Sequence, residues 1–173
     1  ALKIDWNIND DHRASFRYSK LEQSKLRVNG FSSTAASVSS YWYQHDKEIE
    51  SYVGQLFSDW SDNFSTEFKV SYRDFQAVRN PSAKGTPAIK IDFGGIHSSQ
   101  EYGNSPYLWL GTESNTQYNE LYTKTWNYFG AGTLTLGDHD VKFGADFSSN
   151  DINNVYAPYV DGYLEYLGID AFR

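Results

Sequence analysis

Apolar and polar residues alternate along much of this chain, which is the pattern of a β-strand with one apolar face. The first two alternating runs flank the polar cluster 9–12, with Leu2, Ile4, Trp6 and Ile8 before it and Ala14, Phe16 and Tyr18 after it. Two such runs around a short Asn/Asp cluster predict a β-hairpin. Pairing Ile8 with Ala14 puts Trp6 opposite Phe16, so both strands present one apolar face.

A second hairpin is predicted with its turn at 61–63. One face of this hairpin carries Tyr52, Gly54, Leu56, Ser58 and Trp60, followed by Phe64, Thr66, Phe68, Val70 and Tyr72. Pairing Trp60 with Phe64 aligns Tyr52 with Tyr72. At roughly 3.3 Å per residue, the two aromatic pairs are then about 26 Å apart. This separation is close to the roughly 25 Å height of the apolar band of an outer-membrane barrel.

A third hairpin is predicted around 137–140, with Val141, Phe143, Ala145 and Phe147 alternating after the turn. Long loops are expected near 20–40 and 76–117. The second loop contains apolar runs at 88–93 and 107–110 that predict a small hairpin, and one more strand is expected at 163–167. Short turns that alternate with long connections are typical of outer-membrane barrels, whose turns are periplasmic and whose loops are extracellular. We therefore predict an all-β fold of antiparallel strands and hairpins, a section of a large transmembrane β-barrel.

The aromatic content supports a membrane barrel but leaves an alternative open. The chain has 14 Tyr, 11 Phe and 5 Trp, together 17% of 173 residues, and a mean hydropathy of −0.63. A barrel strand exposes only alternate residues to lipid, so its mean hydropathy stays low. A soluble core would favour Leu, Ile and Val over Tyr. The alternative is an extracellular β-sandwich that binds carbohydrate by stacking sugar rings on Tyr and Trp.

Charge and composition argue against several other functions. A net charge of −7 makes nucleic acid an unexpected partner, because phosphate binding needs clustered Lys and Arg. The absence of Cys rules out disulfides, thiolate metal sites and a thiol nucleophile. No nucleophile elbow, zinc-binding helix or phosphate-binding Gly-rich loop is present. We expect no enzyme activity, no catalytic residue and no cofactor.

Three of the histidines have acidic neighbours in the sequence, and Asp, Glu and His can all bind metal ions. His12 and His139 each lie among aspartates in a predicted turn, where Asn and Asp side chains usually close the turn by bonding to nearby backbone. A third cluster follows His45 at 46–50, and its carboxylates would share one face of a strand. We expect no metal site, with a calcium ion bridging loops as the remaining alternative.

Two glycines interrupt the third hairpin. Gly130 and Gly132 lie within an alternating run, where glycine usually marks a bend or a close approach of a neighbouring side chain. A ligand-binding loop is the less expected explanation for them.

The order of these hairpins resembles the barrel of TonB-dependent receptors, specifically the Oar-like (OmpA-related) group. The matching stretches are LKIDWNINDDHRASFRYS at 2–19, SYVGQLFSDWSDNFSTEFKVSYRD at 51–74, YLWLGTE at 107–113 and TKTWNYFGAGTLTLGDHDVKFGADFSSNDINNVY at 123–156. The resemblance implies a barrel of about 22 strands plugged by an N-terminal domain and energised through TonB.

The chain covers only part of such a receptor. We expect 1–173 to be a partial barrel segment from the middle of the wall, without a plug domain, a linker or a closing C-terminal strand. Its expected partners are outer-membrane lipid, the remaining barrel strands, the plug domain and, through the parent protein, TonB. The transported ligand is not identified by the sequence, and the location implied is the bacterial outer membrane.

The alternation assigns residues to two faces. The face expected to contact lipid carries Trp6, Phe16, Leu56, Trp60, Phe64, Phe68, Val70, Tyr72 and Phe143. The opposite face, expected to line the lumen beside the plug, carries Ser65, Glu67, Lys69, Ser71 and Arg73.

Overall fold

The computed structural model describes residues 1–93 and 106–173, which fold into two compact units. Unit 1 comprises Ala1–Glu22, Glu48–Gln76 and Tyr122–Asn153. Unit 2 comprises Gln23–Lys47, Ala77–Leu121 and Asn154–Arg173. Several long strands contribute residues to both units.

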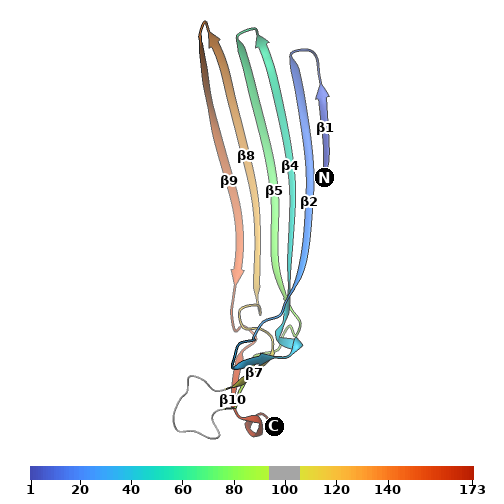
Figure 1. The fold of residues 1–173 in the computed structure, drawn as a ribbon, viewed down its shortest axis with the longest axis vertical. Coiled ribbons are helices and arrows are strands. Elements are labelled where there is room, and N and C mark those ends of the chain that lie inside the picture. The colour runs from blue at the N-terminus through green and yellow to red at the C-terminus, as the bar shows by residue number, and fades with distance from the viewer. Residues whose placement is uncertain (94–105) are drawn as a thin grey trace. The chain divides into compact units, whose positions relative to one another are not determined.

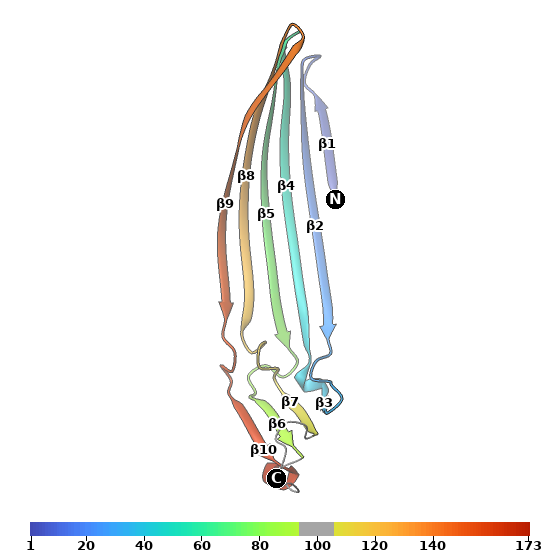
Figure 2. The same ribbon diagram turned by 60° about the vertical axis from the view of Figure 1, so that its left-hand side comes forward.

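Six strands form the larger sheet in the order β1-β2-β4-β5-β8-β9 (Figures 1 and 2). Their bounds are β1 Leu2–Asn7, β2 His12–Arg27, β4 Tyr43–Ser61, β5 Phe64–Pro81, β8 Asn119–Leu136 and β9 His139–Tyr156. Each is the spatial neighbour of the next one along the chain within this set, which gives the hairpin series that the alternation predicted. The prediction of an all-β, antiparallel fold is confirmed. In the described residues the sheet is open, with β1 and β9 at its edges.

The three predicted hairpin turns are present and are short. They comprise residues 8–11, 62–63 and 137–138. The predicted register of the first hairpin was wrong by two residues, because Trp6 pairs with Ala14 and Ile4 with Phe16. A shift of two leaves every side chain on its predicted face, so the apolar face survives the correction.

The predicted loop near 20–40 was wrong over its first part, because β2 continues to Arg27. Here each face of the strand is mainly polar and carries a single leucine, Leu21 on one face and Leu26 on the other, so the alternation is lost. Lys20 and Ser24 bond to residues of β4 instead: Lys20 Nζ lies 2.8 Å from Glu48 Oε1, and the Ser24 hydroxyl donates to Asp46 at 2.5 Å. The predicted loop at 76–117 likewise begins later, since β5 continues to Pro81.

Unit 2 contains a second sheet of four short strands in the order β10-β6-β7-β3. Their bounds are β3 Ala35–Ser37, β6 Ala88–Asp92, β7 Tyr107–Gly111 and β10 Tyr163–Leu167. The antiparallel β6–β7 pair confirms that the apolar runs 88–93 and 107–110 come together, and β10 is the strand expected at 163–167. Unlike the larger sheet, this one also has parallel pairs, β10 with β6 and β3 with β7.

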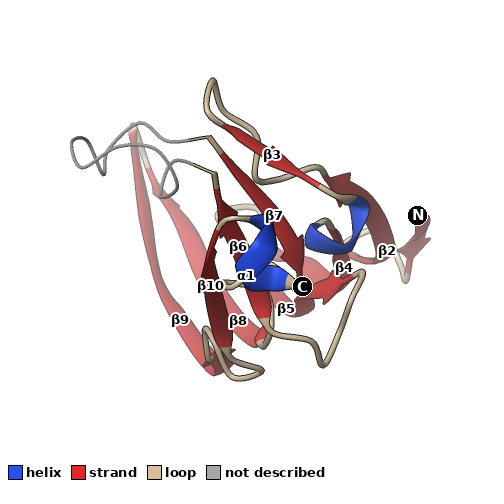
Figure 3. Ribbon diagram, turned by 90° about the horizontal axis from the view of Figure 1, so that it is seen from below, coloured by secondary structure: helices blue, strands red, loops and turns tan. Residues whose placement is uncertain are grey.

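Two short helical turns accompany this sheet. The 3₁₀ turn η1 comprises Ser39–Tyr41, and α1 comprises Ile169–Phe172 and packs against β10 and β6 (Figure 3). No helix in the described part of the chain combines the length and the apolar character needed to cross a membrane.

Unit 2 holds most of the few buried side chains that the structure describes. Tyr41, Ala88 and Ile91 are its buried apolar residues, beside a polar segment at 112–117 that is also largely buried. The Tyr41 ring stacks on Trp109 with 5.0 Å between centroids. Burial, with a smaller contribution from the charge of Glu113, raises the pKa of Tyr41 to about 12.

Glycines of β8 and β9 lie in close contact with neighbouring strands in unit 1. A Cβ at Gly132 would lie 2.7 Å from the Phe143 ring, and one at Gly130 would lie 3.3 Å from the Phe68 ring. The expectation of a close side-chain contact at Gly130 and Gly132 is therefore confirmed. Gly144 is tighter still, since its Cβ would lie 2.6 Å from the backbone carbonyl oxygen of Gly130.

These contacts predict unequal effects of adding a methyl group. Gly144→Ala should destabilise the fold by about 1–3 kcal/mol, because a backbone atom must move to accommodate it. Gly54→Ala is the matched control, since no atom lies within 4 Å of its added Cβ, and it should be neutral or stabilise by about 0.5 kcal/mol. Urea unfolding of the protein in lipid vesicles measures both. Equal effects would show that β8 and β9 are not this close.

Candidate functional site

One face of the sheet in unit 1 consists of exposed apolar and aromatic side chains. Trp6 is 63% exposed, Trp60 58%, Phe68 50% and Phe143 55%. They come from β1, β4, β5 and β9, so the apolar surface extends across the sheet. Soluble monomers rarely expose a continuous apolar patch of more than a few hundred Å².

No part of the described chain covers this face. Ala131 is the single buried apolar residue that unit 1 has among the described residues. In a β-sandwich, the apolar face of each sheet is sealed against the other and forms a core. Unit 1 has no such core, which argues against the sandwich alternative.

A continuous row of aromatic rings crosses five strands of the apolar face. Successive ring centroids are separated by 5.0 Å, 6.2 Å, 4.8 Å, 6.0 Å and 6.2 Å. This aromatic row consists of Tyr18, Tyr52, Tyr72, Trp126, Tyr128 and Phe147. Outer-membrane barrels carry girdles of such residues at the level where hydrocarbon meets the polar interface.

Charged residues follow immediately beyond the aromatic row. The hydroxyls of Tyr18 and Tyr52 donate to the two oxygens of Glu50 at 3.2 Å and 3.4 Å, and the Tyr72 hydroxyl donates to Asp74 at 3.2 Å. The rings thus have carbon on one side and carboxylates on the other. Amphipathic rings take this arrangement where one end is in an apolar phase and the other in water.

Lys20 lies among three carboxylates, one of which is Glu50. Its Nζ is 2.7 Å from Glu22 Oε1, 2.8 Å from Glu48 Oε1 and 3.6 Å from Glu50 Oε1. With Glu50 and Asp74, Lys20 marks the level at which the apolar face of β2, β4 and β5 ends.

Aromatic side chains also gather at the turn end of the sheet. The Trp60 indole N–H donates to the Thr66 hydroxyl at 2.8 Å, and the Trp60 ring lies 5.0 Å from that of His12. The His12 Nδ1 is buried without a hydrogen-bond partner among the described residues. The apolar face is therefore bordered by aromatic residues at both ends.

Seven of the nine residues predicted to contact lipid are exposed in the structure, and Phe64 and Tyr72 are half-buried. Tyr72 loses exposure because its ring packs between those of Tyr52 and Trp126. The nine predicted lipid contacts did not include every exposed apolar residue on this face. The same alternation also places on it Leu2, Ile4, Tyr128, Leu136, Val141 and Phe147.

The opposite face of β5 carries the five residues predicted to line a lumen. Lys69 and Arg73 are exposed, whereas Ser65, Glu67 and Ser71 are half-buried. Polar contacts continue onto the neighbouring strand, since the Asn127 amide donates to the Ser71 hydroxyl at 3.3 Å. We call this side of unit 1 the polar face.

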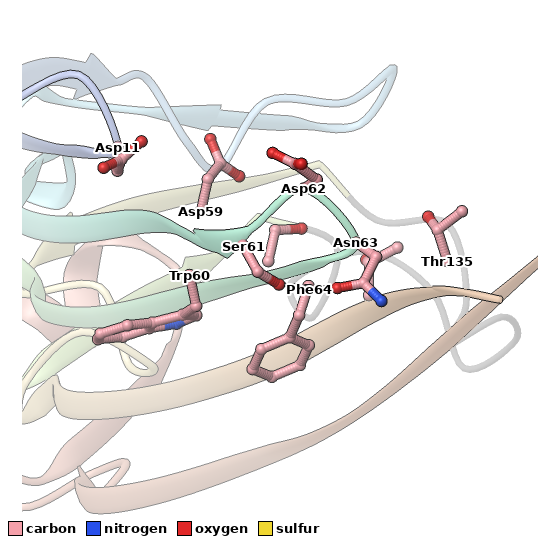
Figure 4. Close-up of a pocket in the computed structure, with 10 residues that line it drawn as sticks. Asp11, Asp59, Trp60, Ser61, Asp62, Asn63, Phe64 and Thr135 are labelled. Carbon is pink, nitrogen blue, oxygen red and sulfur yellow. Dashed lines mark hydrogen bonds between the residues drawn. The ribbon is translucent and has the colours of Figure 1, made fainter.

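Shallow hollows interrupt the polar side chains of unit 1. A hollow of about 440 Å³ lies at the turn end, and in Figure 4 Asp59 and Asp62 point to one side of the ribbon while Trp60 and Phe64 point to the other. A second of about 410 Å³ is lined by residues that include Glu67, Lys69 and Asp146. No group of His, Asp and Glu residues that could hold a metal ion occurs in the described segments.

In the first turn an Asn side chain bonds to nearby backbone, as predicted for the polar cluster around His12. The Asn9 Oδ1 accepts hydrogen bonds from the backbone N–H groups of Asp11 and His12 at 3.0 Å and 2.8 Å. At the third hairpin, the Thr135 hydroxyl donates to Asp140 at 2.6 Å, and His139 is exposed beside it. The bonds of Asn9 to nearby backbone are those of an Asx turn, whereas the Thr135–Asp140 bond joins two side chains across the hairpin.

The carboxylates that follow His45 share one face of β4, as predicted. Asp46 accepts from the Ser24 hydroxyl and, at 2.6 Å, from the Asn80 amide, while Glu48 and Glu50 bind Lys20. His45 has the opposite parity in β4, so its side chain is on the other side of the strand from these carboxylates. Burial lowers the pKa of His45, and the positive charges of Lys47, Arg79 and Arg27 lower it further. These cations were missed as a group because they are far apart in the sequence.

An antiparallel sheet with one uncovered apolar face, an aromatic row and a polar opposite face defines a membrane protein of the β-strand type. The family model of the outer membrane beta barrel domain matches residues 1–171. The chain therefore belongs to this family, and it is located in the bacterial outer membrane. Neither the curated proteins nor the solved structures gave a match to this chain.

The closed first turn gives a direct test of its Asx geometry. Asn9→Ala removes the acceptor of two backbone hydrogen bonds and should cost about 1 kcal/mol of unfolding free energy. Asp10→Ala is the control, because Asp10 forms no side-chain bond within the described residues and should cost little. Urea unfolding with and without EDTA measures both variants. An EDTA-sensitive wild type would favour a metal in this turn instead.

Proposed function

We propose that this chain forms part of the wall of a TonB-dependent transporter. The observation that carries the proposal is the apolar face of unit 1, bordered by aromatic residues at both ends and backed by a polar face. In the proposed arrangement the apolar face contacts outer-membrane lipid and the polar face lines the lumen beside a plug domain. The resemblance of the hairpins to Oar-like receptors supports this choice among outer-membrane barrels.

The proposed wall needs further strands. An open sheet leaves backbone donors and acceptors unpaired at β1 and β9, which hydrocarbon does not tolerate. Barrel strands of the parent protein would pair with both edges and close the wall. TonB would act on the parent through its plug, so this segment has no direct part in energy transfer.

The chain has a structural and binding role in this proposal and catalyses no reaction. The charged side chains of the polar face, such as Glu67, Lys69 and Arg73, would contact the plug or a passing ligand. The short turns at 8–11, 62–63 and 137–138 would be periplasmic, and the long loops predicted near 20–40 and 76–117 would be extracellular. The absence of a nucleophile motif from the sequence supports the expectation that there is no turnover.

Two substitutions on adjacent residues of β5 test the assignment of faces. Phe68→Arg should destabilise the protein in lipid by roughly 2–4 kcal/mol, because Phe68 lies midway between the aromatic borders and an arginine there would enter hydrocarbon. Lys69→Glu should cost little, since Lys69 lies on the polar face and would remain in water. Denaturant unfolding from phospholipid vesicles compares the two.

A conservative substitution at the same position is the control for polarity. Phe68→Leu keeps the apolar character and should stay close to the wild type. If Phe68→Arg and Lys69→Glu cost the same, the sheet does not have one face in lipid and one in water, and the proposed wall is wrong.

A further inference from the structure

Within the described residues of unit 2, three neighbouring strands carry positive charges that form no ion pair with a carboxylate. Arg27 is at the end of β2, Lys47 and His45 are in β4, and Arg79 is in β5. The positive charges of Lys47, Arg79 and Arg27 lower the pKa of His45, and strand pairing brings β2, β4 and β5 side by side at these residues. We call these four residues the basic cluster.

The registers place the basic cluster on one side of the strands. The Ser82 backbone N–H donates to the Trp42 carbonyl at 3.0 Å, and continuing this antiparallel register sets Arg79 opposite His45. Ser24 and Asp46 meet on the other side, where Asp46 also accepts from Asn80. Asp46, the nearest acidic neighbour of His45 in sequence, is thus already bonded on the opposite side.

The cations of the basic cluster differ from Lys20 and Lys90 in their ion pairing within the described residues. Within the described chain, Arg27, Lys47 and Arg79 form no ion pair, whereas Lys20 and Lys90 are each bonded to carboxylates. His45, Lys47 and Arg79 are half-buried, so water screens their mutual repulsion incompletely. This occurs in a chain of net charge −7, in which carboxylates outnumber cations. Uncompensated positive charge at such a site favours the binding of an anion.

We propose that Arg27, His45, Lys47 and Arg79 form a binding site for a soluble anion that carries carboxylate or phosphate groups. Arg27 and Arg79 can each present two N–H donors to such a group, and Lys47 adds a point charge. The anion affinity stands on the cluster alone. Its meaning, capture of a transport ligand at the mouth of a lumen, rests on the proposed function.

The test is calorimetric titration of the complete gene product, purified in a neutral detergent, with inorganic phosphate and with citrate. Wild type should bind at least one of the two. Arg79→Gln and Lys47→Gln should each weaken that binding about tenfold, which corresponds to losing one charge-assisted hydrogen bond. Arg79→Lys keeps the positive charge and should retain part of the affinity that Arg79→Gln loses, which separates the loss of charge from poor folding. Lys142→Gln, an exposed cation of β9 in unit 1, is the matched control and should bind as wild type does.

Three results would overturn the proposal. The first is no binding of either anion by a wild type whose circular dichroism shows a folded β protein. The second is equal weakening by Lys142→Gln, which would mean a general charge effect. The third is a loss of anion binding in nanodiscs when lipopolysaccharide is added to zwitterionic lipid, which would identify a lipid headgroup as the occupant. The unfolding experiments on Phe68→Arg and Lys69→Glu test the proposed wall separately. If they give the expected difference, the failure of the anion site does not contradict the proposed wall.

Protonation of His45 gives an independent readout. The charges that act on His45 are those of Lys47, Arg79 and Arg27, with Asp46 on the opposite side. Lys25 of β2 is a further cation on the side of Arg27, because the pairing of Ser24 with Asp46 sets it opposite His45. The lowered pKa keeps His45 neutral at pH 7 and lets it add a positive charge only at lower pH. Sulfate, whose charge is constant at these pH values, should therefore bind more tightly once the pH falls below the usual titration range of imidazole, and His45→Gln should remove that dependence. A dependence that survives His45→Gln would contradict this role of His45.

Discussion

The structure depends on a single constraint, which is that the apolar face of unit 1 must be covered by something other than this chain. Its aromatic and aliphatic side chains cannot remain in water over so large an area. No described segment packs on them, and Ala131 alone is a buried apolar residue of unit 1 within the described residues. Hydrocarbon satisfies the constraint, and family membership places the protein in the outer membrane.

The borders of that face follow from the chemistry of tyrosine. Tyr18, Tyr52 and Tyr72 each direct a hydroxyl to a carboxylate of Glu50 or Asp74, so the aromatic row has a fixed orientation across the sheet. Their rings extend the apolar surface, and their hydroxyls end it. Because Glu50 and Lys20 are also ion-paired, a shift of the sheet into the bilayer would bury several charges together, which is costly. The row therefore fixes the depth of the sheet.

Much of the fold was predictable because alternation survives wherever one face is apolar. The hairpin turns, the β6–β7 pair and β10 were found in this way. The extension of β2 to Arg27 was not, since both faces of that segment are mainly polar and its hydrogen-bond partners lie on β4. The aromatic row needed the cross-strand registers, and the basic cluster needed them as well, because Arg27, His45 and Arg79 are brought together only by strand pairing. Local sequence carries the period of a strand but not the identity of its neighbours.

The central claim is that the face of β5 bearing Phe68 spans hydrocarbon between two aromatic borders. The most direct measurement places spin labels in turn at 64, 66, 68, 70, 72 and 74 in the reconstituted protein. Collisions with oxygen, which concentrates in the bilayer, are compared with collisions with a water-soluble nickel complex. The account predicts that the ratio rises from position 64 to a maximum near 68 and falls again by 74, where Asp74 lies beyond the aromatic row. A flat profile, or one in which nickel prevails at 68, would contradict it.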